Sequence, residues 1–380
     1  MKIAATIAEF NPMHSGHVRL INEVKKTINP DIFAVILSGN FSERGDVTVK
    51  NKHVRAGWAI KAGADIVVEL PFFYAVNCAE KFAEGAMKVL SCFGQRLTVA
   101  FGSESGNLNE LERLSATVHS ESEEDKKKIR AYLKEGNSLI RARAGALDEK
   151  GLFTPNNTLA IEYIESAKKY GFDSFTIKRE SGFNDLSTEN EFASAQAIRN
   201  CIFEDNFEKI DRFLPDFVKK SLNNCVFNND MSDLIKYRLH TMKTEEIKRL
   251  PEVTEGLENR IKSALEISDD YDSLIRNVKS KRYTMARIKR ILLYALTGLT
   301  ADKMNYFYSA PPYARVLAVR DDKKDALKLL AENGCLVVNF KDVGSLPETV
   351  KDALYFENTV DGVYSVLSKS REPFNATFIK

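Results

Sequence analysis

Apolar positions divide the first two hundred residues into two alternating kinds of segment. Short, almost continuously apolar runs are typical of strands buried on both faces, and they fall at residues 2–8, 32–38, 65–71, 96–102 and 172–178. Between them, apolar residues recur with the helical period over residues 15–28, 50–62, 77–92, 107–150 and 156–170. This alternation predicts an α/β fold, with a parallel sheet covered by helices on both faces.

The pattern changes after about residue 205. Strand-like runs become rare and the helical period dominates, until "ARVLAVRDD" and the segment that follows it mix strand and helix again. We therefore predict three parts: an α/β domain at residues 1–205, a mostly helical domain at 206–308, and a small α/β segment at 309–380 that packs on the rest.

Composition and charge exclude some classes of protein but do not identify the function. The chain of 380 residues has a formal net charge of only +2, so any attraction to a polyanion must come from an uneven distribution of charge. The apolar stretch at the N-terminus is too short for a signal peptide, and no run reaches the roughly 18 residues of a membrane span. Five cysteines without a CxxC pair indicate reduced thiols in a cytoplasmic protein and no metal site.

Two of the five histidines, His14 and His17, fall where the first strand should give way to the first helix. Ligands of an open parallel sheet bind at the carboxyl ends of its strands. The first turn of the next helix offers unpaired N–H groups and a positive dipole end to an anion. Gly16 lets the backbone approach closely. The segment therefore predicts a phosphate site with two imidazole donors.

"NPMHSGH" at residues 11–17 resembles the HxGH motif of the nucleotidyltransferase superfamily. The resemblance implies a Rossmann-like domain in which His14 and His17 contact the triphosphate of ATP and stabilise charge on its α-phosphate. This role agrees with the chemistry of adenylyl transfer, which needs positioning and positive charge more than covalent help.

A second element of that superfamily, ISSTxIR, resembles "FASAQAIR" at residues 192–199. Ser194 and Arg199 match the motif, whereas Ala195 and Gln196 depart from it. Ser194 is expected to cap a helix, and Arg199 to reach the β- and γ-phosphates. His14, His17, Ser194 and Arg199 are the candidate catalytic residues.

Longer blocks resemble one family, the bacterial tRNA(Met) cytidine acetate ligases, in the same order along the chain. They include "IAEFNPMHSGH", "LSGNFSERGD", "FGSESG", "TPNNTLAIEYI", "IKRESGFND", "KSKRYTMARIKR" and "APPYARVLA". The resemblance implies that acetate attacks ATP to form acetyl-adenylate and pyrophosphate. The N4 amine of the wobble cytidine of elongator tRNA(Met) then takes the acetyl group and releases AMP. Phe10, Met13 and Ser15 depart from the family pattern, and these departures could alter affinity for the nucleotide.

The family's ATP site can be carried onto this chain residue by residue. Beside the two histidines it falls on Ile7, Ala8, Glu9, Phe10, Asn11, Pro12, Met13, Ser15, Gly16, Val18, Arg19 and Leu20. It continues on Gly102, on Asn156 or Asn157, and on Arg179. Each of these last positions has a structural alternative: a turn glycine for Gly102, an N-cap for one asparagine, and a surface salt bridge for Arg179. Mg²⁺ is expected with ATP, but no protein ligand for it can be named.

Further basic residues follow the second predicted strand. Arg44, Lys50, Lys52 and Arg55 could hold acetate, pyrophosphate or tRNA, and the sequence does not sort these options. A solvated basic face is the alternative for Lys50 and Lys52.

Residues 276–290 contain seven lysines or arginines and no acid. Basic residues next to an aromatic suit phosphate contacts and unstacked bases. The candidate RNA-binding residues are Arg276, Lys279, Lys281, Arg282, Tyr283, Arg287, Lys289 and Arg290, with Tyr283 available for stacking. Replacing Arg287 and Arg290 is predicted to weaken tRNA binding and to leave adenylation intact. A solvated helical face is the alternative.

Two other functions compete with the ligase. A small-metabolite adenylyltransferase shares the HxGH motif but needs only the first domain. The other is an RNA-binding module that binds ATP but does not catalyse a reaction with it. The presence of His14, His17 and Arg199 disfavours this second alternative. The oligomeric state stays open.

Overall fold

The computed structural model describes the chain except for residues 137–138, 148–152, 180–192 and 380. Its strands are β1 (Ile3–Ala8), β2 (Ile32–Ser38), β3 (Ile66–Leu70), β4 (Thr98–Ser103), β5 (Asp173–Lys178), β6 (Tyr313–Arg320), β7 (Cys335–Val337) and β8 (Thr377–Ile379). Helices up to β5 are α1 (Ser15–Ile28), α2 (Lys52–Lys61), α3 (Phe72–Ala75), α4 (Ala79–Leu90), α5 (Leu108–His119), α6 (Glu123–Lys134), α7 (Leu139–Ala146) and α8 (Pro155–Lys169). Later helices are α9 (Ala195–Phe203), α10 (Asp216–Lys219), α11 (Ser232–Thr241), α12 (Thr244–Lys248), α13 (Leu257–Leu265), α14 (Tyr271–Val278), α15 (Met285–Thr297), α16 (Ala301–Tyr308), α17 (Asp325–Asn333) and α18 (Glu348–Ser368).

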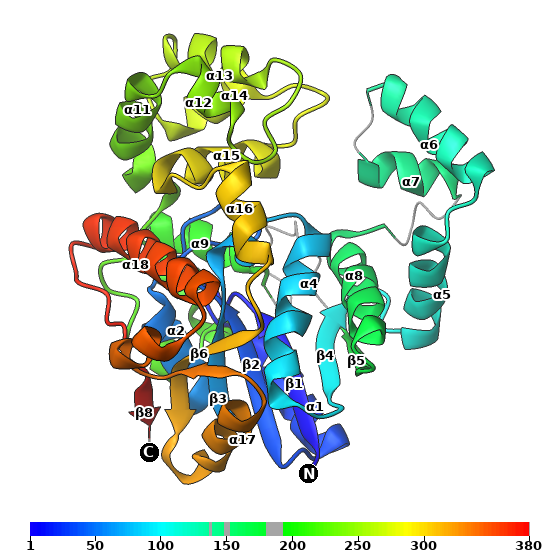
Figure 1. The fold of residues 1–380 in the computed structure, drawn as a ribbon, viewed down its shortest axis with the longest axis vertical. Coiled ribbons are helices and arrows are strands. Elements are labelled where there is room, and N and C mark those ends of the chain that lie inside the picture. Colours follow the sequence, from blue (N-terminus) through cyan, green and yellow to red (C-terminus); the bar gives the residue numbers. More distant parts are fainter. Residues whose placement is uncertain (137–138, 148–152, 180–192, 380) are drawn as a thin grey trace.

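The predicted α/β fold with a parallel sheet is confirmed. The strand order is β5-β4-β1-β2-β3-β6-β7, and β1 to β5 are parallel (Figure 1). The order reverses between β1 and β4, because the chain goes from β1 to β2 and β3 on one side and returns to β4 on the other. This is the place in an open parallel sheet where ligands bind.

Alternate residues of each central strand feed two different cores. In β2, Ile32, Ala34 and Ile36 pack with α4 and α8 on one face of the sheet. Phe33 and Val35 pack with α1, α2 and α9 on the other face. Burial on both faces explains why these strands are continuously apolar in the sequence.

The C-terminal segment extends the N-terminal sheet. Strand β6 pairs with β3 in the antiparallel direction, and β7 and β8 both pair with β6. Residues just after 205 also pack into the first domain, since Phe213 and Val218 belong to the core beside α2. The three-part division of the chain stays a prediction, but the sheet and its cores draw on all three parts.

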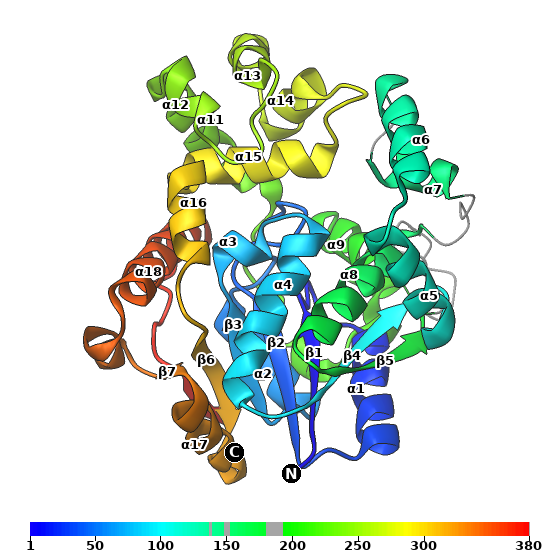
Figure 2. The same ribbon diagram turned by 45° about the vertical axis from the view of Figure 1, so that its right-hand side comes forward.

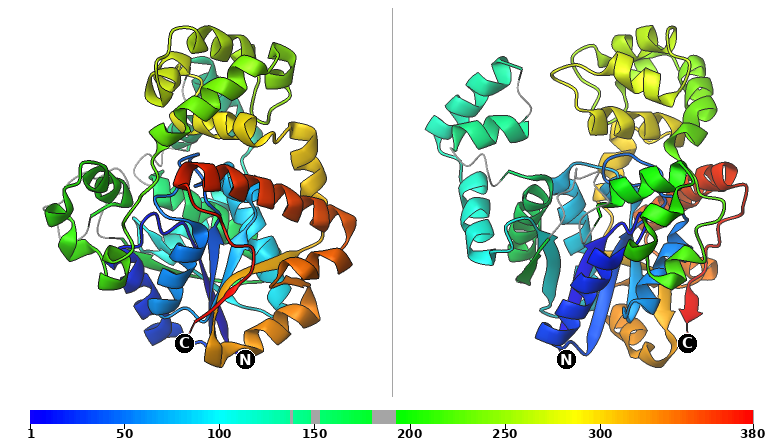
Figure 3. Two further views of the ribbon diagram at one scale, coloured as in Figure 1. Left: turned by 90° about the vertical axis from the view of Figure 1, so that its left-hand side faces the viewer. Right: turned by 180° about the vertical axis from the view of Figure 1, so that it is seen from behind.

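The helices of the second half lie over the carboxyl ends of the parallel strands. Figures 1 and 2 show α11 to α15 above that end of the sheet, with α6 and α7 beside them. The helical region expected at roughly 107–150 consists of three helices, α5, α6 and α7, and its last residues lie outside the described part of the chain. The left view of Figure 3 shows α18, in red and orange, crossing in front of the upper part of the sheet, and this helix also contacts α15 and α16.

The described helices were also compared with the requirements of a bilayer. None of those in the described part of the chain is both long and apolar enough to cross a membrane.

Candidate active site

The chain turns at the carboxyl end of β1 and places His14 and His17 in the first turn of α1. His14 is the N-cap residue, and its Nδ1 accepts a hydrogen bond from the Gly16 N–H at 3.1 Å. The His14 N–H donates in turn to Nδ1 of His17 at 3.2 Å. The ring centroids lie 3.9 Å apart. Because both Nδ1 atoms accept, the proton of each neutral ring lies on Nε2, which becomes a donor.

The histidine pair is neutral and only partly satisfied. His14 is 3% exposed, and its Nε2 is buried without a hydrogen-bond partner. Burial, with help from the Arg179 and Arg199 guanidiniums, lowers the pKa of His14 to about 3. Burial and the neighbouring His14 also hold the pKa of His17 well below its ordinary value. An unpaired buried donor costs about 1–3 kcal/mol, and an anion at this place would satisfy it.

Arg179 lies just beyond the carboxyl end of β5, and its Nε is another buried donor without a partner. Gly102 lies inside β4 rather than in a turn, so the turn alternative is wrong. A Cβ added at Gly102 would lie 3.0 Å from Cγ of Arg179. The glycine therefore makes room for the arginine to lie across β4.

Ser194 and Arg199 lie at the start of α9. As expected, Ser194 is the N-cap, and its hydroxyl accepts from the Ala197 N–H at 3.1 Å. Arg199 donates to the Asn11 carbonyl at 2.7 Å and to Oε1 of Gln196 at 2.5 Å. Gln196 departs from the family motif, yet it holds the arginine. Within the described residues, neither Arg199 nor Arg179 forms an ion pair.

The two asparagines surround a carboxylate that the sequence analysis missed. The N-cap of α8 is Thr154, so capping by an asparagine is wrong. Glu104 performs that function: it accepts the N–H groups of Asn156 and Asn157 at 3.1 Å and 2.8 Å, and the Asn156 side chain at 2.7 Å. Oδ1 of Asn157 accepts from the Ser105 N–H at 3.1 Å. These contacts fix the loop after β4, and a role of either asparagine toward ATP stays a prediction.

The rest of the predicted ATP segment has divided roles. Phe10 and Met13 are core side chains beneath α1 and α2. Ser15, Val18 and Arg19 line a groove of about 500 Å³ with residues 212–215. The remaining members form the strand end, the turn and the helix start around the histidines: Ile7, Ala8, Glu9, Asn11, Pro12, Gly16 and Leu20.

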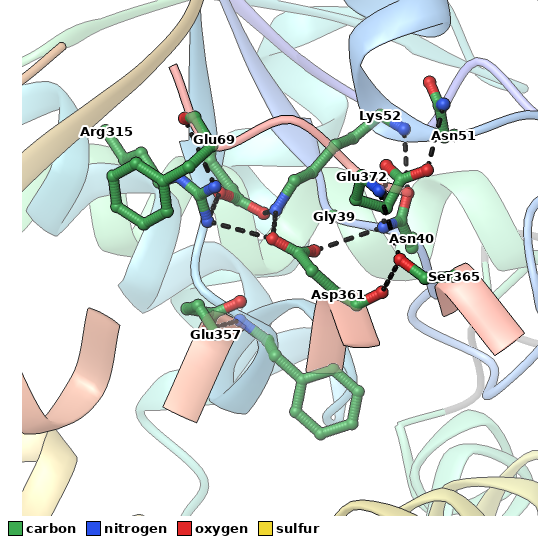
Figure 4. Close-up of polar contacts among 12 residues, drawn as sticks. Gly39, Asn40, Asn51, Lys52, Glu69, Arg315, Glu357, Asp361, Ser365 and Glu372 are labelled. Atoms are coloured by element: carbon green, nitrogen blue, oxygen red, sulfur yellow. Dashed lines mark hydrogen bonds and ion pairs between the residues drawn. The ribbon is translucent and has the colours of Figure 1, made fainter. Parts of the chain in front are cut away.

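Two basic residues predicted as possible ligands belong to the interior instead. Lys52 is fully buried, with Nζ 2.6 Å from both Glu69 and Asp361 (Figure 4). Arg55 is also buried and donates to the carbonyls of Glu9 at 2.6 Å and Ser38 at 3.1 Å, as well as that of Gly39. Neither can hold acetate, pyrophosphate or tRNA, and Lys52 is not on a solvated face.

Lys50 and Arg44 lie elsewhere on the loop between β2 and α2. Lys50 donates to the Asn223 carbonyl at 2.7 Å. Arg44 lies 3.8 Å from the Glu43 carboxylate. Arg44 remains a candidate to hold an anion, and nothing in its geometry selects among the three options.

The predicted RNA-binding residues separate into two groups. Arg276, Lys279, Lys281 and Arg282 are exposed, and among the described residues only Arg282 of these four forms an ion pair, with Glu255 at 3.0 Å. The other four have partners inside the protein: Tyr283, Arg287, Lys289 and Arg290.

This second group corrects the sequence-based picture. Tyr283 is 7% exposed, donates to the Thr254 carbonyl at 3.3 Å, and has the Arg287 guanidinium 5.1 Å from its ring centre, so it is not available for stacking on a base. Arg290 forms an ion pair with Glu252 at 2.7 Å, and Lys289 with Asp46 at 2.6 Å.

Glu9 was among the predicted ATP-site residues, but Glu43 and Asp46 next to it were not singled out by sequence reasoning, although they belong to the "LSGNFSERGD" block. Oε1 of Glu9 accepts from the Glu43 N–H at 2.7 Å. Burial raises the pKa of Glu43 to about 7, against the opposing effects of Arg290 and Arg44. Acids in a predicted phosphate site are not expected from charge alone.

Known proteins resemble this chain over its whole length. The family model described as HIGH Nucleotidyl Transferase matches residues 1–376. The tRNA(Met) cytidine acetate ligase of Clostridium novyi is 35% identical, with 97% of this chain and 96% of that protein covered. The protein of the same name from Thermoanaerobacter sp. (strain X514) is also 35% identical, with 100% and 98% covered.

Solved structures agree with the sequence comparison. Apo TmcAL of Thermotoga maritima superposes with a TM-score of 0.91 at 27% identity, covering both chains completely. The same protein bound with α-thio-ATP gives a TM-score of 0.89. The chain therefore belongs to the HIGH nucleotidyltransferases and, within them, to the tRNA(Met) cytidine acetate ligases, a family of enzymes.

Proposed function

We propose that this protein uses ATP and acetate to acetylate the N4 amine of the wobble cytidine of elongator tRNA(Met), through acetyl-adenylate. The observation that carries the proposal is the group formed by His14, His17, Arg179 and Arg199. These basic side chains gather at the carboxyl ends of β1 and β5 and at the start of α9. Relatives named for this activity, and a structural neighbour bound with an ATP analogue, support it.

In the first step, an oxygen of acetate attacks the α-phosphorus of ATP, and the bond from that phosphorus to pyrophosphate breaks. Negative charge builds on the oxygens of the α-phosphate and on the leaving group. The Nε2 donors of His14 and His17 and the two guanidiniums are arranged to stabilise that charge without moving. Mg²⁺ enters with ATP as part of the substrate.

In the second step, the N4 amine attacks the acetyl carbonyl, AMP leaves, and the amine loses one proton. The base must leave its stack to reach the site. Arg276, Lys279, Lys281 and Arg282 are proposed to bind tRNA phosphates, because they are exposed at the end of α14 and on the loop that joins it to α15, in the helical part that lies over the strand ends. The small-metabolite adenylyltransferase is the second candidate, and these helices speak against it because a small acceptor does not need them.

Incubation with ATP, labelled acetate and bulk bacterial tRNA, followed by nucleoside analysis, tests the proposal. Labelled N4-acetylcytidine is the expected product. Acetyl-adenylate without labelled RNA would support the first step and exclude this acceptor. A dinucleotide product made from a phosphorylated metabolite, with no labelled RNA, would favour the adenylyltransferase.

A further inference from the structure

The turn at residues 42–46, between β2 and α2, is compact. The Gly45 N–H donates to the Ser42 carbonyl at 2.9 Å, and Gly45 has a φ of 78°. The Asp46 N–H donates to the Ser42 hydroxyl at 3.0 Å. Because Ser42 and Asp46, the two ends of the turn, are hydrogen-bonded to each other, we expect the turn to move as one unit.

One side of the turn holds the segment that leads to the histidines. The Glu43 N–H donates to the Glu9 carboxylate at 2.7 Å. Just after the turn, the Val49 N–H donates to Oδ1 of Asn11 at 2.9 Å. The carbonyl of Asn11 in turn accepts from Arg199 at 2.7 Å. The position of the turn therefore affects both Asn11 and the arginine proposed to bind phosphate.

The other side of the turn meets α15. Nζ of Lys289 lies 2.6 Å from Asp46, and Arg290 donates to the Glu43 carbonyl at 3.5 Å. A Cβ added at Gly45 would lie 2.6 Å from the backbone N of Arg290. The backbones of the turn and of α15 therefore lie so close together that a side chain at position 45 would clash, and only glycine fits there.

Charge reinforces the contact. Burial by itself would raise the pKa of Asp46, but Lys289 and Arg199 outweigh it and hold that pKa below its ordinary value. The same carboxylate thus interacts with a lysine of α15 and with an arginine of the ATP site.

We propose that α15 positions the ATP site through the 42–46 turn, so that Lys289 and Arg290 are positioning residues for nucleotide binding and adenylate formation rather than RNA contacts. This inference rests on the proposed function only for its adenylation step. It reverses the expectation that replacing Arg290 leaves adenylation intact, because the residue supports the turn that holds Glu9 and Asn11.

Calorimetric titration with α,β-methylene-ATP tests the inference without acetyl transfer. Lys289→Met keeps the aliphatic chain and removes the charge, and we expect the Kd to rise about tenfold, within the range measured for coupled neighbours. Gly45→Ala should raise the Kd at least as much. Lys289→Arg should restore binding to within about twofold of the wild type. Lys248→Met, on exposed α12, is the matched control and should bind as the wild type does.

Acetate-dependent exchange of pyrophosphate into ATP supplies the second measurement. In Lys289→Met, assayed well below its melting temperature, the KM for ATP should rise while the KM for acetate stays unchanged, which a general loss of stability would not produce. Wild-type Kd values in both Lys289→Met and Gly45→Ala would overturn the inference. If the wild type binds the analogue but acetylates no tRNA, the proposed function fails, and the binding result still decides the inference.

Discussion

Two clusters of buried basic residues lie around one sheet, and they differ in what balances their charge. In the first, Lys52 and Arg315 are surrounded by Glu69 and Asp361 at 2.6 to 3.2 Å (Figure 4). In the second, His14, His17, Arg179 and Arg199 gather without a carboxylate in ion-pair contact with either arginine, as far as the chain is described. Buried basic residues alone therefore do not identify a ligand site.

The presence or absence of carboxylate partners distinguishes a structural cluster from a candidate ligand site. Lys52 and Arg315 outweigh the effect of burial and hold the pKa of Asp361 below its ordinary value, so the opposite charges of this cluster balance one another in the free protein. It joins α2 and β3 to β6 and α18. Nε of Arg315 also lacks a hydrogen-bond partner, but its guanidinium is in ion-pair contact with two carboxylates. The unpartnered donors of the histidine cluster, on His14 and Arg179, have no such carboxylate among the described residues, and an anion can satisfy them.

The largest expected effect is at the unbalanced cluster. His17→Ala removes one donor aimed at developing charge, and adenylate formation should fall about a hundredfold or more. Acetate-dependent pyrophosphate exchange measures it. His240→Ala, an exposed histidine on α11, is the control. Normal turnover in His17→Ala would remove the histidine from the mechanism.

The balanced cluster should respond in stability instead. Lys52→Met leaves Glu69 and Asp361 buried without their shared cation, and the free energy of unfolding should fall by about 3–5 kcal/mol. Urea unfolding measures this change. Lys61→Met, at the exposed end of the same helix, should behave as the wild type does. A Lys52→Met variant as stable as the wild type but unable to bind ATP would place the lysine in the ligand site.

A smaller effect is expected where the exposed basic residues meet RNA. Replacing Arg276 and Lys281 by alanine should weaken tRNA binding about tenfold and lower the salt dependence by about one released ion per lost phosphate contact. Filter binding at several salt concentrations measures both quantities. Lys328→Ala on α17, far from these helices, is the control. Unchanged affinity would exclude this surface from the RNA site.

The smallest expected effect is the uptake of protons when ATP binds. His14 has a pKa of about 3 in the free protein, and bound phosphate charge should raise it. At pH 6 the complex then holds more protons than the free protein, so ATP binding takes up a fraction of a proton and strengthens as the pH falls from 8 to 6. Calorimetry in buffers of different ionisation enthalpy measures the uptake. The proton uptake should be smaller in His14→Gln. Equal uptake in that variant and in the wild type would contradict its assignment to His14.

Local patterns were sufficient for most of the fold. The five parallel strands were predicted to within two residues at each end, because burial on both faces leaves a continuous apolar run. The start of the first helix at residue 15 was also predicted, and so was the cap at Ser194, since capping depends on neighbours three residues apart. The capping of α1 by His14 was not predicted. The helical region at roughly 107–150 was predicted without its division into α5, α6 and α7, because periodicity does not show where one helix ends and the next begins.

The sequence by itself determined which segments are strands and helices, and where the histidines stand relative to the first strand. Only the tertiary structure decided which basic residues form ion pairs within the protein and are therefore not available to a ligand. Lys52 meets Asp361, which is 309 residues away in the chain, and Lys289 meets Asp46, 243 residues earlier. No local pattern contains these partners, because ion pairs form between residues that the fold brings together.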